Sequence, residues 1–213
     1  MRTVVFGGNG GIGKPVVERL QTMGYDVTAP RSFEVNLNNT EEVEHIINKC
    51  LPEVLIDLAV YNVDGMIHKT DIEEAEKQTQ INSLGFLRAV RFALPHMRER
   101  KFGRIIYVSS VLSTRPIPGI GLYAATKSFS ESIVRSVALE NAKYGITCNS
   151  IHLGYCEAGI IEKVPENILP KVIDNIPLKR LGRTSEVCDT VKYILKTEYL
   201  TGANIDLSGG LHI

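Results

Sequence analysis

Three residues of this chain could form a proton-transfer site: Tyr123, Lys127 four positions later, and Ser110 thirteen positions earlier. Positions i and i+4 of a helix share a face, so the phenol and the ammonium can point into one site. A phenol ordinarily has a pKa of about 10, which a neighbouring ammonium lowers toward neutrality. The serine hydroxyl could then hold a carbonyl or alcohol oxygen. Because Tyr-x-x-x-Lys is also common on helices without catalytic meaning, the surrounding sequence has to decide.

The length and composition are those of one soluble globular domain spanning residues 1–213. Apolar residues make up 44% of the chain and charged residues 23%, which is enough apolar material for a substantial core. Lys plus Arg equals Asp plus Glu, at 24 each, so we expect no nucleic-acid partner. No run approaches the roughly 18 apolar residues of a membrane span, so we expect no membrane partner.

The cysteines are scattered, with neither a CxxC pair nor a cluster with histidine. This distribution predicts reduced, mostly buried thiols, no metal site and a cytoplasmic protein. The apolar run that ends at Phe6 is too short for a signal peptide. One of the cysteines could instead be a reactive thiol, because it lies beside the candidate site. The four cysteines are Cys50, Cys148, Cys156 and Cys188, and Cys156 is the one beside the site.

Short apolar runs alternate with longer helical patterns along the chain. The expected strands are Thr3–Phe6, Asp26–Ala29, Val54–Leu58, Arg104–Ser109, Thr147–His152 and Asn204–Leu207. The expected helices are Ile12–Met23, Thr40–Lys49, a long one within Ile72–Arg100, Gly121–Tyr144 and Ser185–Lys196. Near-continuous apolar strands suit a parallel sheet that is covered on both faces. We therefore expect an α/β, doubly wound, Rossmann-like fold, with Pro95 kinking or splitting the long helix.

The first strand leads into the glycine-rich segment Gly7-Gly8-Asn9-Gly10-Gly11-Ile12-Gly13. Glycines at positions 7, 11 and 13 would allow a sharp turn, close approach to a pyrophosphate and tight helix packing. The following helix would direct its N-terminal N–H groups at the phosphates. Its place between a strand and a helix favours dinucleotide binding over a merely flexible turn. Beyond the three key glycines, we expect Asn9, Gly10 and Ile12 to line the cofactor.

The segment after the second strand bears on which dinucleotide is bound. An acid there would hold the ribose hydroxyls of NAD, whereas an arginine accommodates the 2′-phosphate of NADP. The chain reads Ala29-Pro30-Arg31-Ser32-Phe33, with no acid before Glu34. Arg31 and Ser32 therefore favour NADP over NAD, the alternative being that Arg31 is a solvated loop charge.

Together these motifs resemble the short-chain dehydrogenase/reductase family, over nearly the whole chain. The glycine loop matches, with Phe6 where threonine is usual, and Tyr123-Ala-Ala-Thr-Lys127 resembles the family's Tyr-x-Ala-Ser-Lys. Asn82 and Ser110 occupy the other two catalytic positions. C-terminal signatures resemble those of bacterial 3-oxoacyl-carrier-protein reductases. These signatures are Ile176–Arg183, Leu200–Gly202 and Ser208–Gly210.

The resemblance implies a mechanism for an NAD(P)-dependent oxidoreductase. Ser110 would hydrogen-bond the substrate oxygen, and Tyr123 would give or accept the proton. Lys127 would lower the pKa of the phenol and contact the nicotinamide ribose. Asn82 would help a water connect the lysine to solvent. The expected substrate is a carbonyl/alcohol pair, such as a 3-oxoacyl thioester or another small ketone.

Two segments depart from the family pattern. Asp57–Val60 replaces Asn-Asn-Ala-Gly, so only Ala59 survives, and Leu153 and Ala158 replace a proline and a threonine. Ala59, Gly154 and Cys156 are expected to contact the cofactor. The departures could be harmless, or they could alter the affinity for adenosine and the hold on the nicotinamide.

The chain is also shortened around the second and third strands. Only eleven residues separate Gly24 from Asn36, which is too few for a full crossover helix. The third strand of the family is therefore expected to be vestigial, with Asn36 and Leu37 flanking the adenine. The selectivity inferred from Arg31 depends on this altered loop.

The sequence leaves alternatives to a reductase open. One is a non-catalytic sensor of the NADP redox state, motivated by the altered segments. Another is an isomerase or dehydratase that retains the cofactor. The region 158–175 could be a substrate lid or ordinary helix packing. A homodimer or homotetramer is expected by analogy through 72–100 and 121–144, although the stripe of Phe86, Val90 and Leu94 could face the core instead.

Overall fold

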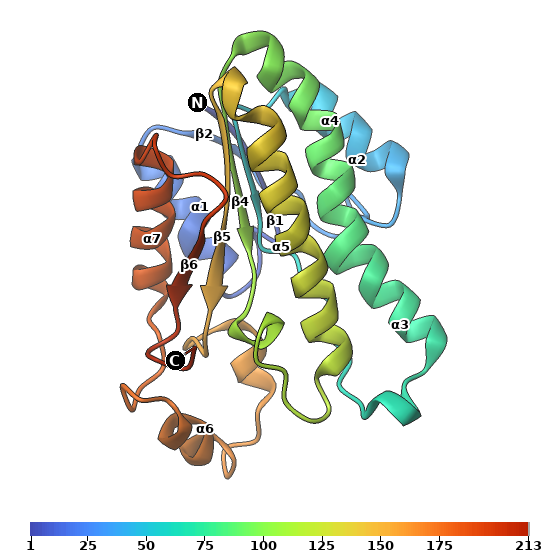
Figure 1. Cartoon of the computed structure of the whole chain (residues 1–213), viewed down its shortest axis with the longest axis vertical. Coiled ribbons are helices and arrows are strands. Elements are labelled where there is room, and N and C mark those ends of the chain that lie inside the picture. Colours follow the sequence, from blue (N-terminus) through green and yellow to red (C-terminus); the bar gives the residue numbers. More distant parts are fainter. Residues whose placement is uncertain (213) are drawn as a thin grey trace.

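The computed structural model describes residues 1–212, which form one six-stranded parallel sheet with helices on both faces (Figure 1). The strand order is β2-β1-β3-β4-β5-β6. The strands are β1 Arg2–Phe6, β2 Asp26–Thr28, β3 Val54–Asp57, β4 Gly103–Val108, β5 Ile146–Leu153 and β6 Asn204–Leu207. The doubly wound α/β fold expected from the sequence is confirmed.

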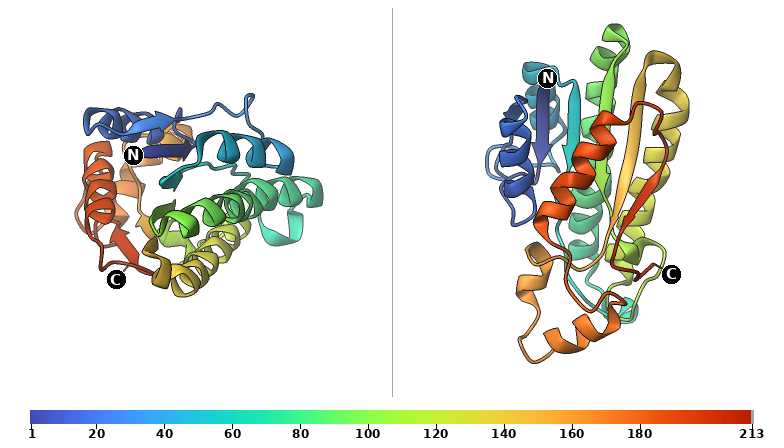
Figure 2. Two further views of the ribbon diagram at one scale, coloured as in Figure 1. Left: turned by 90° about the horizontal axis from the view of Figure 1, so that it is seen from above. Right: turned by 90° about the vertical axis from the view of Figure 1, so that its left-hand side faces the viewer.

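Helices α1 and α7 cover one face of the sheet, and α2, α4 and α5 cover the other (Figures 1 and 2). The α-helices are α1 Gly13–Thr22, α2 Thr40–Cys50, α3 Ile72–Thr79, α4 Gly85–Arg100, α5 Gly121–Asn141, α6 Leu169–Asn175 and α7 Thr184–Lys196. Single turns of 3-10 helix are found at Ile67–Lys69, Val111–Ser113, Ala142–Tyr144 and Gly159–Lys163.

The strands are apolar throughout because successive side chains enter different cores. On β4, Ile105 and Tyr107 pack under α2, α4 and α5, whereas Ile106 and Val108 pack under α1 and α7. Side chains of a strand alternate between the two faces, so a strand in the middle of a covered sheet has no solvent-facing row. This arrangement accounts for the near-continuous apolar runs in the sequence.

The long helical stretch is not split at Pro95, contrary to one expectation, because α4 continues to Arg100. A proline removes one backbone hydrogen bond, and the remaining bonds of the helix hold it together here. The irregularity lies earlier, where Gln80–Leu84 forms a π-helical turn between α3 and α4. Such turns are frequent at functional sites, and this one contains Asn82.

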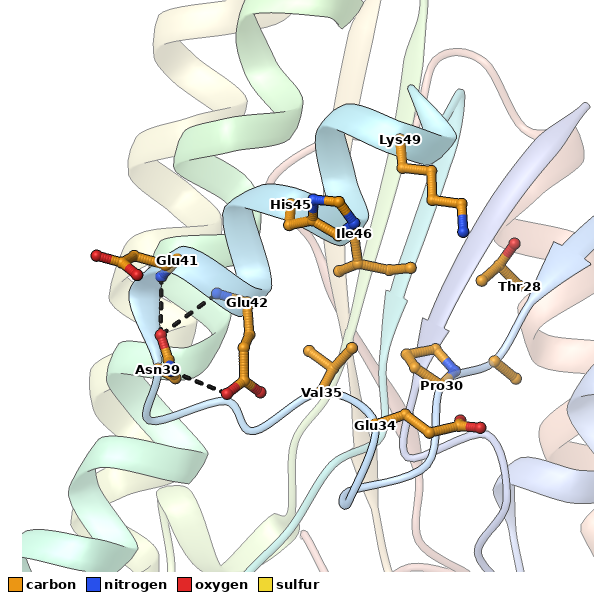
Figure 3. A pocket seen from close by; sticks show the side chains of 11 residues that line it. Thr28, Pro30, Glu34, Val35, Asn39, Glu41, Glu42, His45, Ile46 and Lys49 are labelled. Atoms are coloured by element: carbon orange, nitrogen blue, oxygen red, sulfur yellow. Dashed lines mark hydrogen bonds between the residues drawn. The ribbon is translucent and has the colours of Figure 1, made fainter.

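The connection from β2 to α2 is short, as the sequence predicted. Within residues 1–212 no strand lies between these elements, so β2 is the edge of the sheet. The loop enters α2 at Asn39, whose side chain accepts hydrogen bonds from the N–H groups of Glu41 and Glu42. A surface pocket of about 540 Å³ lies between the loop, β2 and α2 (Figure 3). Glu34, Glu41, Glu42, His45 and Lys49 are among its lining residues.

The segment between β5 and α7 lies beyond the carboxyl ends of the strands, where Figure 1 shows α6. Its 3-10 turn and α6 have few buried side chains, Ile161 being one of them. The segment therefore covers this end of the sheet and is not part of either main core. None of the helices described is long and apolar enough to cross a membrane.

Candidate active site

The glycine loop connects the carboxyl end of β1 to the start of α1. Gly7 has a φ of +72°, and a Cβ there would lie 2.6 Å from the backbone nitrogen of Ala59. A Cβ on Gly13 would lie 2.1 Å from the carbonyl oxygen of Gly7. Both positions are therefore closed to any side chain. The amide of Asn9 donates to the carbonyl of Ala29 at 2.9 Å, which ties the loop to the end of β2.

This loop fits the phosphates of a dinucleotide. Helix α1 has no acidic residue in its own first turn, which would favour an anion at its positive end. The carboxylate of Glu162, which accepts from Gly159 N–H, lies beside Gly11 at this end. The glycines leave backbone N–H groups open to an approaching anion. Gly10 and Gly11 need no left-handed backbone, and the nearest contact of a Cβ on Gly10 would be at 3.3 Å. The segment could therefore hold a pyrophosphate, as the sequence predicts.

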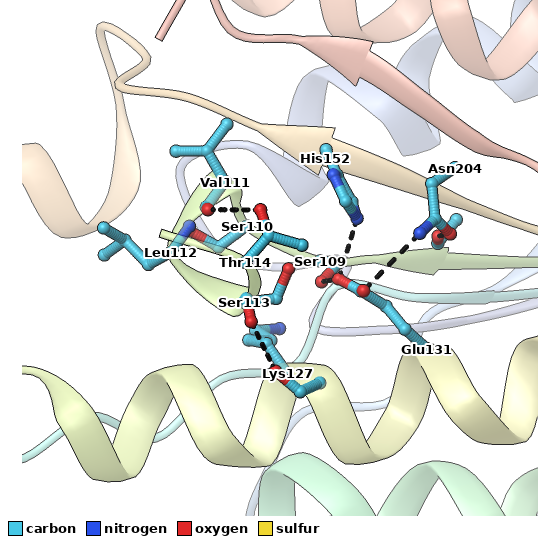
Figure 4. Close-up of polar contacts among 12 residues, drawn as sticks. Ser109, Ser110, Val111, Leu112, Ser113, Thr114, Lys127, Glu131, His152 and Asn204 are labelled. Atoms are coloured by element: carbon cyan, nitrogen blue, oxygen red, sulfur yellow. Dashed lines mark hydrogen bonds and ion pairs between the residues drawn. The ribbon is translucent and has the colours of Figure 1, made fainter. Parts of the chain in front are cut away.

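Ser110, Tyr123 and Lys127 are all buried at the carboxyl end of β4. Ser110 follows β4 and caps the 3-10 turn, since its Oγ accepts from the N–H of Leu112 at 3.2 Å. Tyr123 and Lys127 lie in the first turns of α5 on the face turned to the sheet. The ammonium of Lys127 donates to the carbonyl of Val108 at 2.8 Å. Figure 4 shows Ser110 and Lys127 from these two elements in one view.

The pKa of Tyr123 is raised, which differs from the lowering that the sequence predicted. Burial raises it to about 12, the hydroxyl of Ser110 partly offsets this, and the charge of Asp64 adds to it. Lys127 Nζ lies 5.7 Å from the centroid of the Tyr123 ring and 4.6 Å from that of Tyr107. The ammonium is thus held by the Val108 carbonyl and lies over the ring of Tyr107. With a pKa of about 12, the phenol of Tyr123 keeps its proton at neutral pH.

A buried carboxylate and a buried ammonium, those of Asp57 and Lys127, attract each other at the site. Burial lowers the pKa of Lys127 to about 8, against the opposing charges of Asp57 and Glu131. Burial raises the pKa of Asp57 to about 6, against the Ala59 N–H and Lys127. Asp57 ends β3, where the family usually has asparagine, and its Oδ1 accepts from Ala59 N at 2.8 Å. This departure therefore places a negative charge beside the lysine.

Asn82 is fixed by both ends of its amide. Its Oδ1 accepts from the N–H of Tyr61 and its Nδ2 donates to the Tyr61 carbonyl, both at 2.8 Å. Its backbone carbonyl accepts from the hydroxyls of Tyr107 at 3.2 Å and Ser130 at 3.1 Å. The π-helical turn directs this carbonyl inward. Asn82 thus holds the loop that follows β3 against α5.

Sequence reasoning missed two carboxylates near the site. Glu131, one turn after Lys127, is buried, accepts from Ser109, and lies 2.9 Å from Nε2 of His152 (Figure 4). Burial raises the pKa of Glu131, but the contacts with His152 and Ser109 outweigh this and lower it overall. Burial raises the pKa of both Tyr123 and Tyr155, and the charge of Asp64, the second carboxylate, adds to it. Only the four-residue spacing from Lys127, which places Glu131 on the same helix face, could have indicated this carboxylate from the sequence.

The residues expected at the adenosine lie in or near the shortened loop. Arg31, Ser32 and Asn36 are exposed. The backbone N–H of Arg31 donates to Oε2 of Glu34 at 2.7 Å. The Arg31 guanidinium lies 5.7 Å from the centroid of Phe33. Leu37 is instead buried in the core under α2, α4 and α5. The loop therefore offers an exposed cation and hydroxyl at the end of β2.

The residues expected at the nicotinamide follow β5. Gly154 packs against Ser208, where a Cβ would lie 2.8 Å from its Cα. Cys156 is buried, and its backbone pairs with that of Gly182 in an isolated parallel β-bridge. Burial raises the pKa of its thiol to about 11. The thiol of Cys156 is thus protonated at neutral pH, which disfavours a nucleophilic role. Gly11 lies close to Gly159, since a Cβ on Gly11 would be 2.8 Å from Gly159 N, so this segment reaches the phosphate loop.

Comparisons with known proteins agree with this geometry. The family model described as "Enoyl-(Acyl carrier protein) reductase" matches residues 12–212. The 3-oxoacyl-[acyl-carrier-protein] reductase of Mycobacterium tuberculosis is 29% identical over 98% of this chain and 91% of the relative. The corresponding protein of Staphylococcus aureus is 27% identical over 93% of this chain and 82% of the relative.

Solved structures share the fold at lower identity. The 3-ketoacyl-(acyl-carrier-protein) reductase of Brucella melitensis, solved with NADH, superposes with a TM-score of 0.92 at 19% identity, covering 99% of this chain and 98% of its own. A structure described as ElxO with NADP bound gives 0.89 at 22% identity, covering 99% and 98%. The chain therefore belongs to the short-chain dehydrogenase/reductase family and is a nicotinamide-dependent oxidoreductase.

Proposed function

We propose that the chain reduces the ketone of a 3-oxoacyl thioester, or of a similar small ketone, with NADPH. The observation that carries this proposal is the burial of Ser110, Tyr123 and Lys127 together at the carboxyl end of β4, at the same edge of the sheet as the glycine loop that follows β1. The named relatives are 3-oxoacyl-carrier-protein reductases, which supports the substrate class. A sensor without activity has no use for this set of groups, and no comparison supports that alternative.

The protonation state of Tyr123 favours the reductive direction. With a pKa of about 12, the phenol carries its proton at pH 7 and can donate it to the oxygen of a reduced carbonyl. The Ser110 hydroxyl would hold that oxygen while negative charge develops on it. A bound nicotinamide supplies the hydride. The glycine loop, with Gly154 and the backbone of Cys156, would hold the cofactor in place.

Lys127 would serve the same step through charge. Its ammonium, now on Val108, can turn toward the nicotinamide ribose and the phenol when a cofactor binds. A cation brought near the phenol lowers its pKa and eases proton loss. Asn82 would help to hold a water that connects the lysine to solvent. Asp57 would help to keep the lysine protonated despite its burial.

The preference for NADP over NAD rests on Arg31 and Ser32. Both are exposed at the end of β2, where a cation and a hydroxyl suit a 2′-phosphate. Asn36 would lie on the adenine side, with Leu37 behind it in the core. Glu34 accepts from the backbone N–H of Arg31 rather than from its side chain, and the guanidinium, which lies over the exposed ring of Phe33, would turn to the ligand.

The test is a turnover assay in which NADPH oxidation is followed with a panel of 3-oxoacyl thioesters of different chain lengths. Small ketones without a thioester serve as the matched comparison. We expect substrate-dependent NADPH oxidation that is fastest with a thioester. Tight NADPH binding without turnover on any member of the panel would contradict the proposal, and product formation without net NADPH loss would indicate an isomerase or dehydratase.

We also propose a cytoplasmic homo-oligomer, a dimer or tetramer, that associates through α4 and α5. Phe86 and Val90 are buried in the protein's own core, so the stripe seen in the sequence faces inward. The outer faces of these helices instead expose Leu87, Phe129 and Leu139. Exposed apolar residues on neighbouring helices suit a contact with a second copy. Light scattering of the purified chain tests this.

A further inference from the structure

We propose that His152, Asp206 and His212 form a binding site for a divalent transition-metal ion of the Zn²⁺ class. One potential ligand atom from each of these residues lies within 4.8 Å of the other two. The sequence predicted no metal site, because the three residues come from β5, β6 and the turn after β6 rather than from one motif. The fold brings them together, outside the cofactor and substrate residues described above.

The register of the sheet places the first two ligands side by side. His152 on β5 is paired with Asp206 on β6 in a parallel ladder. Neighbouring strands lie about 4.8 Å apart, and paired side chains point to the same face. The face is that of α5, because His152 contacts Glu131 of that helix. An imidazole and a carboxylate are therefore held together by backbone hydrogen bonds rather than by a flexible loop.

A tight turn returns His212 to the same place. Gly209 and Gly210 have φ angles of +65° and +93°, which side chains disfavour. Arg115 donates to the carbonyl of Leu211 at 2.9 Å, which fixes the chain just before the histidine. His212 Nδ1 then lies 2.8 Å from Oδ2 of Asp206. Its ring is edge-on to that of His152, with the centroids 5.2 Å apart.

A buried carboxylate orients the imidazole of His152. Its Nε2 lies 2.9 Å from Oε1 of Glu131, and both side chains are almost fully buried. Metal-bound histidines usually give their second nitrogen to such a carboxylate, which fixes the ring and raises its basicity. With Nε2 held by Glu131, a metal ion would bind Nδ1. Ser109 and Asn204 also contact Glu131 (Figure 4), so the orienting group is itself held.

The donor set determines which ions fit. Two imidazoles and one carboxylate suit Zn²⁺ and its neighbours Co²⁺ and Ni²⁺, whereas Mg²⁺ and Ca²⁺ prefer oxygen ligands. Metal–ligand bonds of about 2.1 Å place ligand atoms about 3.4 Å apart in a tetrahedral site. His212 Nδ1 and Asp206 Oδ2, now 2.8 Å apart, must separate slightly, and the ligand atom of His152 must come to the same spacing. Asp206 and His212 can allow these shifts because both are partly exposed. Their exposure also gives the ion a route in and leaves a fourth position for water.

An ordinary ion pair accounts for only part of the cluster. The contact between Asp206 and His212 explains those two side chains, yet it gives no reason for a second imidazole beside them. Within residues 1–212 this is the one group of three such side chains whose ligand atoms come this close. The buried pair of Glu131 and His152 supplies the second observation, since it holds the imidazole of His152 beside Asp206 and His212.

The test uses the full chain without an affinity tag, stripped of metal with a chelator and then desalted. Zn²⁺ is titrated calorimetrically, and Co²⁺ is titrated in parallel because its visible absorption reports the number and type of ligands. Two variants, Asp206→Asn and His212→Gln, change partly exposed side chains and should leave the fold intact. His68→Gln changes an exposed histidine on a distant turn and is the matched control.

We expect one ion per chain, with affinity lowered at least about tenfold in each of the two site variants and unchanged in the control. Zn²⁺ should also raise the Tm of the parent and of His68→Gln only. Absence of saturable binding by the parent would overturn the site. So would parental affinity in either site variant, or an equal loss in the control. None of these readouts depends on turnover or cofactor binding.

Discussion

The catalytic and the adenosine-binding regions of the molecule are built in different ways. Ser110, Tyr123 and Lys127 are buried, and backbone groups of Leu112 and Val108 hold the side chains of Ser110 and Lys127. Arg31 and Ser32 are exposed on a loop that has lost the usual third strand. The core packing that holds the sheet together therefore also holds the catalytic groups, whereas cofactor selectivity rests on side chains that pack against little else. Substitutions should separate chemistry from selectivity along this division.

The largest effect is expected for Ser110→Ala, which changes one of the buried catalytic residues. Removing a hydroxyl that holds the developing oxyanion lowers kcat by about 10²–10³. NADPH affinity should stay within about twofold, because the hydroxyl faces the substrate. Stopped-flow and steady-state assays measure the two quantities. Ser132→Ala, on the exposed face of α5, is the matched control, and equal turnover in both variants would remove Ser110 from the mechanism.

Asp57→Asn should change the pH dependence of stability. The pKa of Asp57 is raised from 3.8 to about 6 in the folded protein, so the folded state binds the proton more tightly than the unfolded state. Its contribution to stability is complete below about pH 4 and is lost as the pH rises through 6, by about 3 kcal/mol at pH 7. Urea unfolding from pH 4 to 7 should show this loss in the parent only.

The control for this measurement is Asp26→Asn, which changes an exposed carboxylate on β2 and should keep the parental pH profile. A parental loss of stability that persists in Asp57→Asn would assign the titration to another group. Asp57→Asn also restores the asparagine that the family usually has at this position. The same measurement therefore shows whether the aspartate lowers the stability of this chain.

Arg31→Ala should have a smaller effect, confined to the cofactor. Loss of a charge-assisted contact with the 2′-phosphate should weaken NADPH binding about tenfold, or about 1.4 kcal/mol, and leave NADH binding unchanged. Stability should not change, because the side chain is exposed. Fluorescence titrations of both cofactors measure this, with Arg135→Ala on α5 as the control. Unchanged NADPH affinity and equal NADH binding would show that the chain does not select NADP.

The sequence predicted the fold and the grouping of the candidate catalytic residues because both depend on short, local patterns. Strands covered on two faces are apolar at every position, and the Tyr123–Lys127 spacing places both groups on one helix face. The shortened connection after β2 could be counted from Gly24 to Asn36. The loss of the third strand followed from that count.

Other features depend on which distant residues the fold brings together. The continuation of α4 through Pro95 and the π-helical turn at Asn82 reflect packing that no local pattern reports. The raised pKa of Tyr123 comes from burial and from Asp64, while Lys127 turns to Val108. The contact of Glu131 with His152 joins α5 to β5 across the sheet register, so it could not be read from either segment alone.

The most direct test of the central claim compares Tyr123→Phe with the parent in two measurements on the same preparations. NADPH binding is titrated, and turnover of a 3-oxoacyl thioester is measured. We predict that the variant binds NADPH with parental affinity and that its kcat falls by at least about 10²-fold, because only the proton donor is lost. Parental turnover in the variant would contradict the account, since Tyr123 would then not supply the proton.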